Sequence, residues 1–514
     1  MDNPKNKLAA IITASSLGTL IEWYDFYIFG SLATIIATKF FPQGNNTVAL
    51  LSTLATFAAG FVVRPFGALV FGRLGDMVGR KYTFLVTLVL MGVSTFAIGC
   101  VPSYSSIGYA APIIVLILRL VQGLALGGEY GGAATYVAEH APKHRRGYYT
   151  SFIQTTATAG LFLSLLVIVS TKMVLGNNLF NEWGWRVPFW ISIIMVAVSV
   201  IIRYNMQESP LFEKAKAEGK ISTNPLAESF GNSYNFKYVL LALFGATMGQ
   251  GVVWYTGQFY ALNFIQTTLN INITQASTIL MWGLLLGTPL FVLCGYLSDI
   301  YGRKWIMLSG MLLAIICYRP IYTKMYEVGS VQAKAAVTFT ADSMVKYIPF
   351  AQANNDTTIS KTITRSYTDG TVYTITTTGT KNSAVNEINT STALGTSGYW
   401  WLVLLVWVQV VFVAMVYGPI AAFLVELFPT KIRYTSMSLP YHIGNGIFGG
   451  LLPTIALFLT SSAAIANANA VKLTQALPYA KPYLQGLWYP ITVAGLCLLI
   501  GAIYITNDKT NKHD

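Results

Sequence analysis

Two short stretches decide the fold of this chain: Gly72–Lys81, which reads GRLGDMVGRK, and Gly295–Lys304, which reads GYLSDIYGRK. Six of their ten positions match in the same register, although one stretch lies in the first half of the chain and the other in the second. Each stretch lies between two apolar segments. The chain therefore repeats one plan, which predicts two halves of similar structure in parallel orientation.

A second pair of matching segments supports the duplication. Glu139–Pro142 and Glu426–Pro429 each end in proline, and basic residues follow both. The separation from Gly295 to Glu426 is nearly twice the separation from Gly72 to Glu139. The second half therefore carries an insertion between its two motifs, which we expect within 323–398.

The composition places the repeat in a membrane. Of 514 residues, 54% are hydrophobic and only 10% are charged, and the mean hydropathy is +0.54. Soluble domains carry about 25% charged residues, which argues against a soluble enzyme. The sequence predicts an all-α polytopic membrane protein with twelve transmembrane helices, at roughly 9–38, 48–71, 82–101, 112–138, 148–175, 187–205, 238–267, 275–298, 305–322, 399–427, 434–460 and 485–506.

The distribution of basic residues predicts the orientation. Nineteen of the 33 Lys and Arg residues fall in the tails and loops on the side of the termini, against five in the short loops opposite. Basic loops stay in the cytoplasm, so we expect both termini there, in the cytoplasmic (inner) membrane of a bacterium. The net charge of +13 then reflects topology, and no nucleic-acid partner is implied.

These patterns divide the chain into five parts. They are an N-terminal six-helix bundle (1–205), a cytoplasmic linker (206–237), a C-terminal six-helix bundle (238–506), an extracytoplasmic insertion within it (323–398) and a cytoplasmic tail (507–514). In the insertion, the alternating stretch 362–375 centres on Asp369-Gly370, a turn signal that predicts a β-hairpin; a disordered loop is the alternative. Because long loops are tolerated where they do not pack, we expect the insertion to be dispensable.

Several motifs resemble one family. The segment Gly18–Gly30 (GTLIEWYDFYIFG), RPFGALVFG at 64–72, RLVQGLALGGEYGGA at 119–133, EHAPKHRRG at 139–147 and ELFPTKIRYT at 426–435 are similar to those of the metabolite:proton symporters. These are sugar-porter-like general substrate transporters of the major facilitator superfamily. The resemblance implies the major facilitator fold and proton-driven uptake of small metabolites such as dicarboxylates, citrate, shikimate, proline or betaine.

Charged residues inside predicted spans are the first site candidates, because charges at membrane depth are costly and usually functional. Glu22 and Asp25 are three positions apart on one helix face, and Arg119 lies in the fourth span. We expect Asp25, Glu22 and Arg119 to couple protons, with a structural ion pair as the alternative.

A second group is expected to control conformation. Arg64 and Glu129 lie at similar depth and are expected to pair, either as a structural clamp or as a gate. The resemblance implies that Asp76 and Asp299 each cap a helix of the opposite half. That group of gating residues is Arg64, Asp76, Arg80, Glu129, Asp299 and Arg303.

Polar and aromatic residues within spans are candidates for binding a solute. Gln250, Trp254 and Gln258 recur at four-residue steps in the seventh span. Interhelical hydrogen bonding is an equally good interpretation of this stripe, and a lone histidine such as His442 is more often structural. The predicted substrate-binding residues are Tyr27, Arg119, Gln250, Trp254, Gln258, Tyr441 and His442.

The sequence therefore predicts a secondary active transporter. We expect proton-coupled symport of a small polar metabolite, an organic acid or a zwitterion, by alternating access. An uncoupled facilitator or exchanger is the alternative, and a transporter-derived sensor a weaker one. No nucleophile elbow, P-loop or metal-ligand cluster is evident, so we expect no enzyme activity, no cofactor and no metal. The expected partners are substrate, protons and the lipid bilayer, with the chain acting as a monomer.

Overall fold

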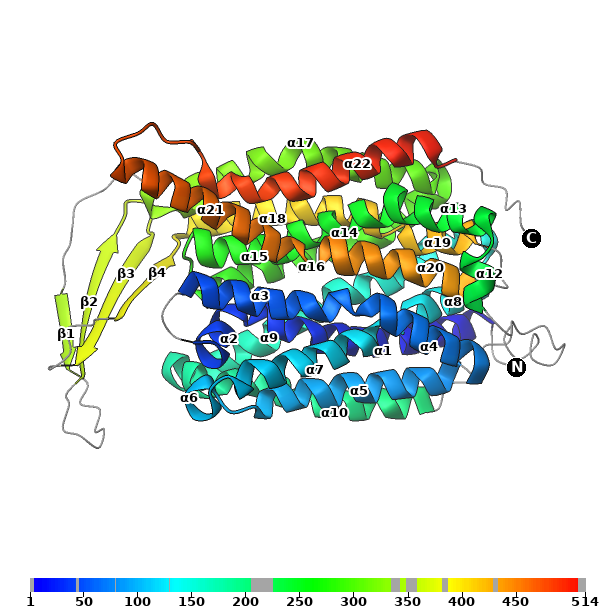
Figure 1. Cartoon of the computed structure of the whole chain (residues 1–514), viewed down its shortest axis with the longest axis horizontal. Coiled ribbons are helices and arrows are strands. Elements are labelled where there is room, and N and C mark those ends of the chain that lie inside the picture. Colours follow the sequence, from blue (N-terminus) through cyan, green and yellow to red (C-terminus); the bar gives the residue numbers. More distant parts are fainter. Residues whose placement is uncertain are drawn as a thin grey trace.

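The computed structural model describes residues 4–42, 46–78, 80–128, 130–204, 225–333, 343–347, 358–380, 387–428 and 433–506. Helices run side by side along the long axis of the molecule (Figure 1). α1 (Pro4–Ser31) begins and α22 (Trp488–Tyr504) ends at one end, which we call the terminal face. A β-sheet stands at the opposite end, the sheet face.

Twelve membrane-spanning segments can be assigned among the described residues. Ten segments of the described chain are long and apolar enough to cross a membrane. An eleventh span is formed by α1 and α2 (Ala33–Phe40), which meet at a bend of 63°. α5 (Arg80–Cys100), whose apolar part is shorter, completes the twelve. The predicted all-α polytopic fold is confirmed.

The other helices of the first half are α3 (Asn46–Val62), α4 (Arg64–Val78), α6 (Tyr104–Ile107), α7 (Ala110–Gly127), α8 (Tyr130–His140), α9 (Arg146–Glu182) and α10 (Val187–Tyr204). Those of the second half are α12 (Pro225–Phe230), α13 (Ser233–Ala242), α14 (Met248–Tyr255), α15 (Ala261–Asn263), α16 (Ile273–Tyr301), α17 (Arg303–Gly329), α18 (Thr396–Tyr417), α19 (Ile420–Leu427), α20 (Arg433–His442) and α21 (Leu452–Lys472).

The two halves form two groups of helices that pack against each other. In Figure 1 the blue and cyan helices lie below the green to red ones, and α9 and α16 meet between them. α20 packs on α4 and α8. Large apolar side chains such as Phe66 (60% exposed), Ile194 (64%) and Leu499 (61%) cover the outer surface. Such exposure suits contact with lipid.

π-helical turns interrupt two spans of the second half. The seventh span contains Leu243–Thr247, Thr256–Tyr260 and Phe264–Thr268 in this form, and the eleventh contains η7 (Ile443–Gly449). A π-helical turn changes which side chains face a neighbouring helix and is frequent at functional sites. The four-residue spacing of polar residues therefore does not by itself define one helix face here.

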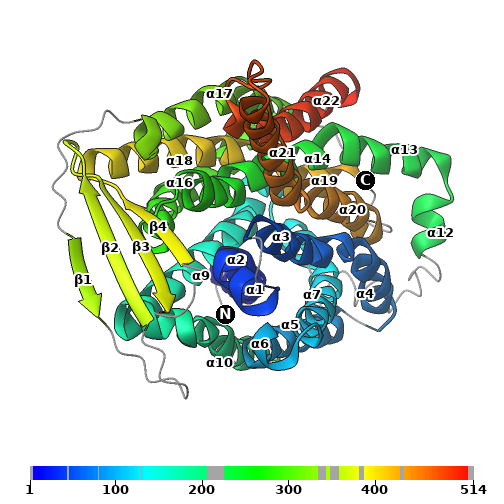
Figure 2. The same ribbon diagram turned by 60° about the vertical axis from the view of Figure 1, so that its left-hand side comes forward.

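The insertion folds into a four-stranded antiparallel sheet in the order β1 (Ser343–Tyr347), β2 (Thr358–Ser366), β3 (Val372–Thr380), β4 (Glu387–Ala393). β2 and β3 form the predicted hairpin around Asp369-Gly370, where Gly370 has a positive φ of 79°. The sheet slants across the sheet face, with β4 nearest the helices and β1 farthest from them (Figure 2).

The predicted linker 206–237 contains α12 and the first residues of α13, and its residues 206–224 lie outside the described ranges. Two expectations about the insertion need correction. α17 continues to Gly329, so the insertion begins later than residue 323. Finally, the insertion is packed: Thr392 of β4 bonds through its backbone to Asn270 and Asn272. The argument that it is dispensable because it does not pack is therefore wrong.

Candidate functional site

The acidic residues of α1 are buried in the middle of the molecule. Glu22 is 2% exposed and Asp25 is 0% exposed. Within the described part of the chain, neither carboxylate oxygen of Asp25 has a hydrogen-bond partner. An unpaired charge at this depth is costly, so Asp25 remains a candidate site residue.

Arg119 does not pair with Asp25 in this conformation. Its guanidinium donates to the carbonyl oxygens of Phe26 (3.4 Å) and Phe57 (3.3 Å) and to Oε1 of Gln122 (2.7 Å). It also lies over the Phe26 ring, 4.1 Å from the centroid. These contacts tie α7 to α1 and α3, which makes Arg119 a connector of three helices here.

Arg64 is also fully buried, but its surroundings differ. Its guanidinium lies over the rings of Phe61 (4.1 Å), Phe26 (4.3 Å) and Trp23 (5.3 Å). None of its three side-chain nitrogens has a hydrogen-bond acceptor among the described residues. The predicted partner Glu129 lies outside those residues. Cation–π contacts therefore surround the Arg64 charge, and within the described residues its side-chain N–H groups donate no hydrogen bond.

A small central cavity of about 10 Å³ joins the two halves. Its lining combines an acid, a guanidinium and an imidazole from α1, α4 and α20. The residues are Thr19, Glu22, Trp23, Arg64, Leu126, Tyr130, Tyr441 and His442. The structure thus brings the candidates Glu22, Arg64, Tyr441 and His442 together, whereas Asp25 and Arg119 are not in this lining.

Tyrosines form a polar layer next to the cavity. The rings of Tyr130 and Tyr441 stack with centroids 3.5 Å apart and an interplanar angle of 3°. The Tyr441 hydroxyl lies 2.7 Å from that of Tyr417, and Gln154 donates to the Tyr130 hydroxyl. Sequence reasoning missed Tyr130 and Tyr417. Tyr130 lies within the quoted motif 119–133, which was the available signal.

The three residues at four-residue spacing in the seventh span, Gln250, Trp254 and Gln258, make different kinds of contact. Gln250 and Asn445 exchange two amide hydrogen bonds of 3.1 and 2.8 Å, and Gln258 donates to Thr158 at 3.4 Å. These are the interhelical contacts that the alternative interpretation expected. The Trp254 ring instead stacks on Tyr27 of α1, with centroids 5.4 Å apart.

An aromatic layer lies between the central cavity and the sheet face. The Phe259 ring contacts Tyr27 and Phe57, with centroid separations of 5.0 and 5.3 Å. Phe61 and Tyr255 meet edge to face at 5.1 Å. Each of these pairs joins the first half to the second, so the two bundles are in contact on the sheet side of the cavity.

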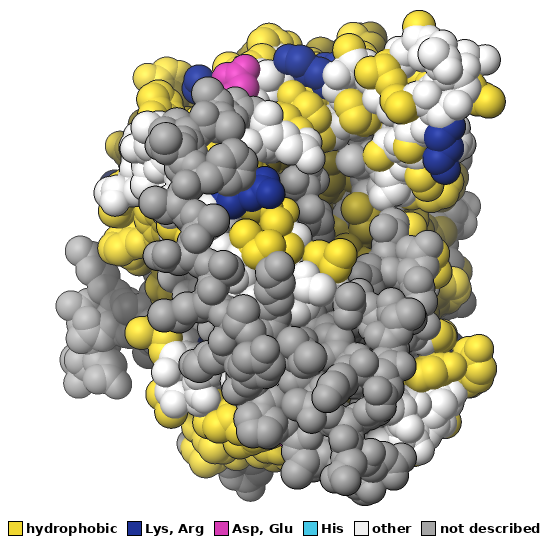
Figure 3. All heavy atoms as spheres, turned by 90° about the vertical axis from the view of Figure 1, so that its left-hand side faces the viewer, with side chains coloured by type: hydrophobic (Ala, Val, Ile, Leu, Met, Phe, Trp, Pro, Cys, Tyr) yellow, Lys and Arg dark blue, Asp and Glu magenta, His cyan; other side chains and the backbone are white. Residues whose placement is uncertain are grey.

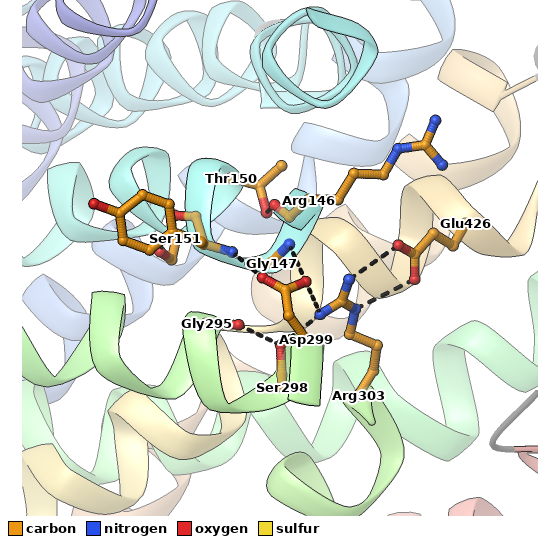
Figure 4. A network of polar contacts seen from close by, with 10 residues as sticks. Arg146, Gly147, Thr150, Ser151, Gly295, Ser298, Asp299, Arg303 and Glu426 are labelled. Carbon is orange, nitrogen blue, oxygen red and sulfur yellow. Dashed lines mark hydrogen bonds and ion pairs between the residues drawn. The ribbon is translucent and has the colours of Figure 1, made fainter. Parts of the chain in front are cut away.

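At the terminal face, one carboxylate joins the halves (Figure 4). Asp299, near the end of α16, accepts hydrogen bonds from the backbone N–H groups of Gly147 (2.9 Å) and Tyr148 (2.8 Å) at the start of α9. The helix N-terminus has unpaired N–H groups and a partial positive charge. Asp299 therefore caps a helix of the opposite half.

Arg303 connects this cap to a third helix. It forms an ion pair with Asp299 at 2.6 Å, and its Nε and Nη2 donate to the Glu426 carboxylate at 3.3 and 3.0 Å (Figure 4). The corresponding residues of the first copy, Asp76 and Arg80, have side chains outside the described part of the structure.

Among the described residues, no group of three His, Cys, Asp or Glu side chains is placed to hold a metal ion. Instead, two bundles of membrane helices enclose a buried cluster of charges and tyrosines and meet on both sides of it. That arrangement is typical of a membrane transporter.

Comparison with known proteins identifies the family. The model of the "Sugar (and other) transporter" family matches residues 10–229. The chain is 30% identical over 469 residues to the inner membrane metabolite transport protein YhjE of Escherichia coli, covering 89% of each chain. It is 34% identical to the proline/betaine transporter of Escherichia coli over 331 residues, 62% of this chain and 64% of that protein.

A solved structure shares the fold. The proton:xylose symporter XylE of Escherichia coli superposes with a TM-score of 0.61, at 18% identity, covering 98% of this chain and 97% of that one. The chain thus belongs to the major facilitator superfamily, among its sugar-porter-like metabolite transporters. It is a transporter and not an enzyme.

Proposed function

We propose that the chain is a proton-coupled symporter of a small polar metabolite, an organic acid or a zwitterion, that works by alternating access. The observation that carries this proposal is the central cavity. It gathers Glu22 and Arg64 from one bundle with His442 from the other, and Asp25 lies on the same helix as Glu22. Acids that carry protons and a cation that binds solute are the groups such coupling needs.

In this proposal each buried charge has its own role. Asp25 and Glu22, three positions apart on α1, carry the proton. The Arg64 side-chain nitrogens, which have no acceptor among the described residues, suit a carboxylate of the solute, which a guanidinium binds in bidentate fashion. Tyr27, Trp254, Tyr441 and His442 line the path. Arg119 acts indirectly through α1, because its guanidinium donates a hydrogen bond to the backbone carbonyl of Phe26, the residue after Asp25.

The gating proposal rests on the contacts at the terminal face. Asp299 and Arg303 hold α16, α9 and α19 together there. Breaking them would let the bundles separate on that side, while the aromatic layer around Phe259 keeps the sheet side closed. We propose the same gating role for Asp76 and Arg80 in the first copy of the motif. Glu129 and Arg64 are proposed to take part in gating deeper in the bundle.

The proposed orientation places the terminal face in the cytoplasm and the sheet outside. The excess of basic residues in the loops on the side of the termini supports it. The inner-membrane location of the relative YhjE supports the inner membrane of a bacterium. A central cavity lined by both bundles of one chain supports a functional monomer in the lipid bilayer. Proline and betaine, the substrates in the name of a second relative, are suitable test solutes.

The test uses purified protein in proteoliposomes with an imposed proton gradient. Asp25→Asn and Glu22→Gln are compared with Glu182→Gln, an exposed glutamate at the end of α9. We expect Asp25→Asn to lose uphill uptake but to retain exchange at equal solute concentrations on both sides, and Glu182→Gln to behave as wild type. If the rate of wild-type uptake does not depend on the proton gradient, the chain is a facilitator or exchanger. If Asp25→Asn still shows uphill uptake at the normal rate, Asp25 is not the proton carrier, and Glu22 takes that role in the proposal.

A further inference from the structure

The insertion lines a second, larger cavity, at the sheet face. This cavity has a volume of about 490 Å³ and walls from both bundles and from β4. The first half contributes Thr34, Ala37, Thr38, Pro42, Ala49 and Leu50; the second half contributes Gln266, Thr267, Asn270, Ile271, Asn272 and Ile273; β4 contributes Asn389, Thr390 and Ser391. We call it the vestibule.

The vestibule lies on the path toward the central cavity. Gln266 and Thr267 belong to the same span as Phe259, about two turns farther toward the sheet face. Thr34 likewise follows Gly30, whose neighbour across the bundles is the Phe259 ring. The aromatic layer around Phe259 therefore separates the two cavities, and a solute from the sheet side meets the vestibule first.

β4 is fixed to the second bundle by specific contacts. Thr392 donates its backbone N–H to Asn270 (2.7 Å) and accepts from the N–H of Asn272 (3.0 Å). Asn270 Nδ2 donates to the Thr390 hydroxyl at 2.6 Å. Gln275 both donates to and accepts from the backbone of Leu394, at 3.1 and 2.7 Å. β4 thus moves with the second bundle, and the facing wall of α2 and α3 moves with the first.

The lining has the chemistry of a site for uncharged polar groups. Nine of the lining residues are Thr, Ser, Asn or Gln, and none of the described lining residues is charged. The amide nitrogen of Gln266 is buried and has no acceptor in the described part of the chain. The described basic side chains seen on this face gather in its upper part, over the second bundle (Figure 3). A dianion would find no counter-charge among the described lining side chains, and an unpaired charge is costly to desolvate.

We propose that the vestibule is a solute-binding site of its own, in which Asn389, Thr390 and Ser391 of the insertion help select net-neutral solutes rich in hydrogen-bonding groups, such as zwitterions or polyols, over organic dianions. The selection takes place before the solute reaches the charged central cavity. This assignment rests on the proposed function, since it names which of the two proposed solute classes the chain admits.

The test labels single cysteines in the vestibule of the full-length protein in proteoliposomes. Asn389→Cys and Thr38→Cys lie on opposite walls, and both are made in a Cys100→Ser background because Cys100 is exposed. Thr364→Cys, in β2 and outside the lining, is the matched control. The rate of reaction with a membrane-impermeant thiol reagent is measured without solute and with proline, glycine betaine, D-xylose or 2-oxoglutarate.

We expect at least one net-neutral solute to slow labelling at both vestibule positions several-fold, with 2-oxoglutarate and the control position unaffected. Binding of that solute is also measured directly. It should become about tenfold weaker in two variants, the effect of losing one or two hydrogen bonds. These are the double variant Asn389→Leu/Ser391→Ala and the single variant Gln266→Leu. Thr364→Val should leave affinity unchanged. Correct folding of each variant is checked by gel filtration.

The outcomes separate this inference from the proposed function. Protection of both cysteines without proton-driven uptake would leave the vestibule standing and overturn the symport proposal. Proton-driven uptake of a solute that protects neither cysteine would support the symport proposal and overturn the vestibule as its binding site. Equal protection by 2-oxoglutarate would refute the selection for neutral solutes, and labelling that no solute in the panel slows would refute the site.

Discussion

The rings of Tyr130 and Tyr441 stack face to face across the boundary between the two bundles, with centroids 3.5 Å apart. Tyr130 begins α8, and Tyr441 lies near the end of α20. Both line the central cavity. A solute that enters from the terminal face has to pass between helices that this stack holds together, so we expect the stack to help Asp299 and Arg303 keep the terminal side closed.

The first prediction concerns this stack. Tyr441→Leu should weaken the closed arrangement by about 1 kcal/mol, because an aromatic pair contributes ~0.5–1.5 kcal/mol beyond its buried area. Tyr441→Phe keeps the ring and loses only the hydroxyl contact with Tyr417, so it should have the smaller effect. Labelling of a cysteine at Ser438, measured from the terminal side, reports the change. Equal labelling in the two variants would show that the ring stack does not hold the gate.

The second prediction concerns the cap. Asp299→Asn removes the charge that faces the start of α9 and the ion pair with Arg303. A carboxylate at a helix N-terminus contributes about 0.3–1 kcal/mol, and up to ~2 kcal/mol when partly buried. Turnover should fall and accessibility from the terminal side should rise about fivefold, while solute affinity changes little. Glu327→Gln, an exposed residue paired with Lys324, is the control.

A large loss of solute affinity in Asp299→Asn with normal turnover would contradict the gating role. That result would mean that the contact at the terminal face acts on the binding site and not on the equilibrium between conformations. Turnover equal to that of the Glu327→Gln control would show that the cap is structural only.

The third prediction tests how closely α9 and α16 need to approach. A Cβ atom added at Gly295 would lie 2.5 Å from Cβ of Ser151 and 2.6 Å from the carbonyl oxygen of Gly147. Gly295→Ala should therefore disfavour the conformation closed at the terminal face by about 1–3 kcal/mol, the usual cost of overpacking. Gly495→Ala, in α22, has open space around the added atom and should behave as wild type.

The readout for these glycines is the population of each conformation. Gly295→Ala should raise terminal-side labelling and slow transport without abolishing expression. An unchanged labelling pattern in a well-folded Gly295→Ala protein would mean that α9 and α16 adjust without separating.

The sequence was a good guide where the signal was local or repeated. The apolar segments predicted the spans, the paired motifs predicted the duplication, and Asp369-Gly370 predicted one hairpin. The cap by Asp299 followed from the resemblance. β1 and β4 carried no comparable turn signal. The pairing of Thr392 with Asn270 and Asn272 joins segments that are far apart in the chain, which periodicity does not relate.

Side-chain partners across helices were the hardest to predict. A structural ion pair of Arg119 with an acid of α1 was one expectation, but in this structure Arg119 bonds to the carbonyl oxygens of Phe26 and Phe57. A helical pattern places residues on a face, but it does not fix the rotation of one helix against another. π-helical turns shift that rotation further. For the same reason the Tyr130–Tyr441 stack and the Gln250–Asn445 pair could not be derived from spacing.

The last prediction separates the two buried arginines. Arg119 makes three hydrogen bonds that join α7 to α1 and α3 and brace its own helix. Hydrogen bonds to charged groups contribute about 1.5–3 kcal/mol, so Arg119→Gln should clearly lower the thermal unfolding temperature in detergent. Arg119→Lys should not restore it, because an ammonium group cannot reproduce the planar fork that reaches two carbonyls.

For Arg64 we expect the reverse: its replacement should affect stability little and transport strongly. Its guanidinium has no hydrogen-bond acceptor in the described ranges and is held over aromatic rings. Cation–π contacts contribute about 0.5–2 kcal/mol, and removing a buried charge returns part of its desolvation cost. Arg64→Gln should therefore change the unfolding temperature little while it abolishes uptake of solutes with a carboxylate. If Arg64→Gln is the less stable of the two proteins and still transports, Arg64 is a structural clamp and the solute carboxylate binds elsewhere.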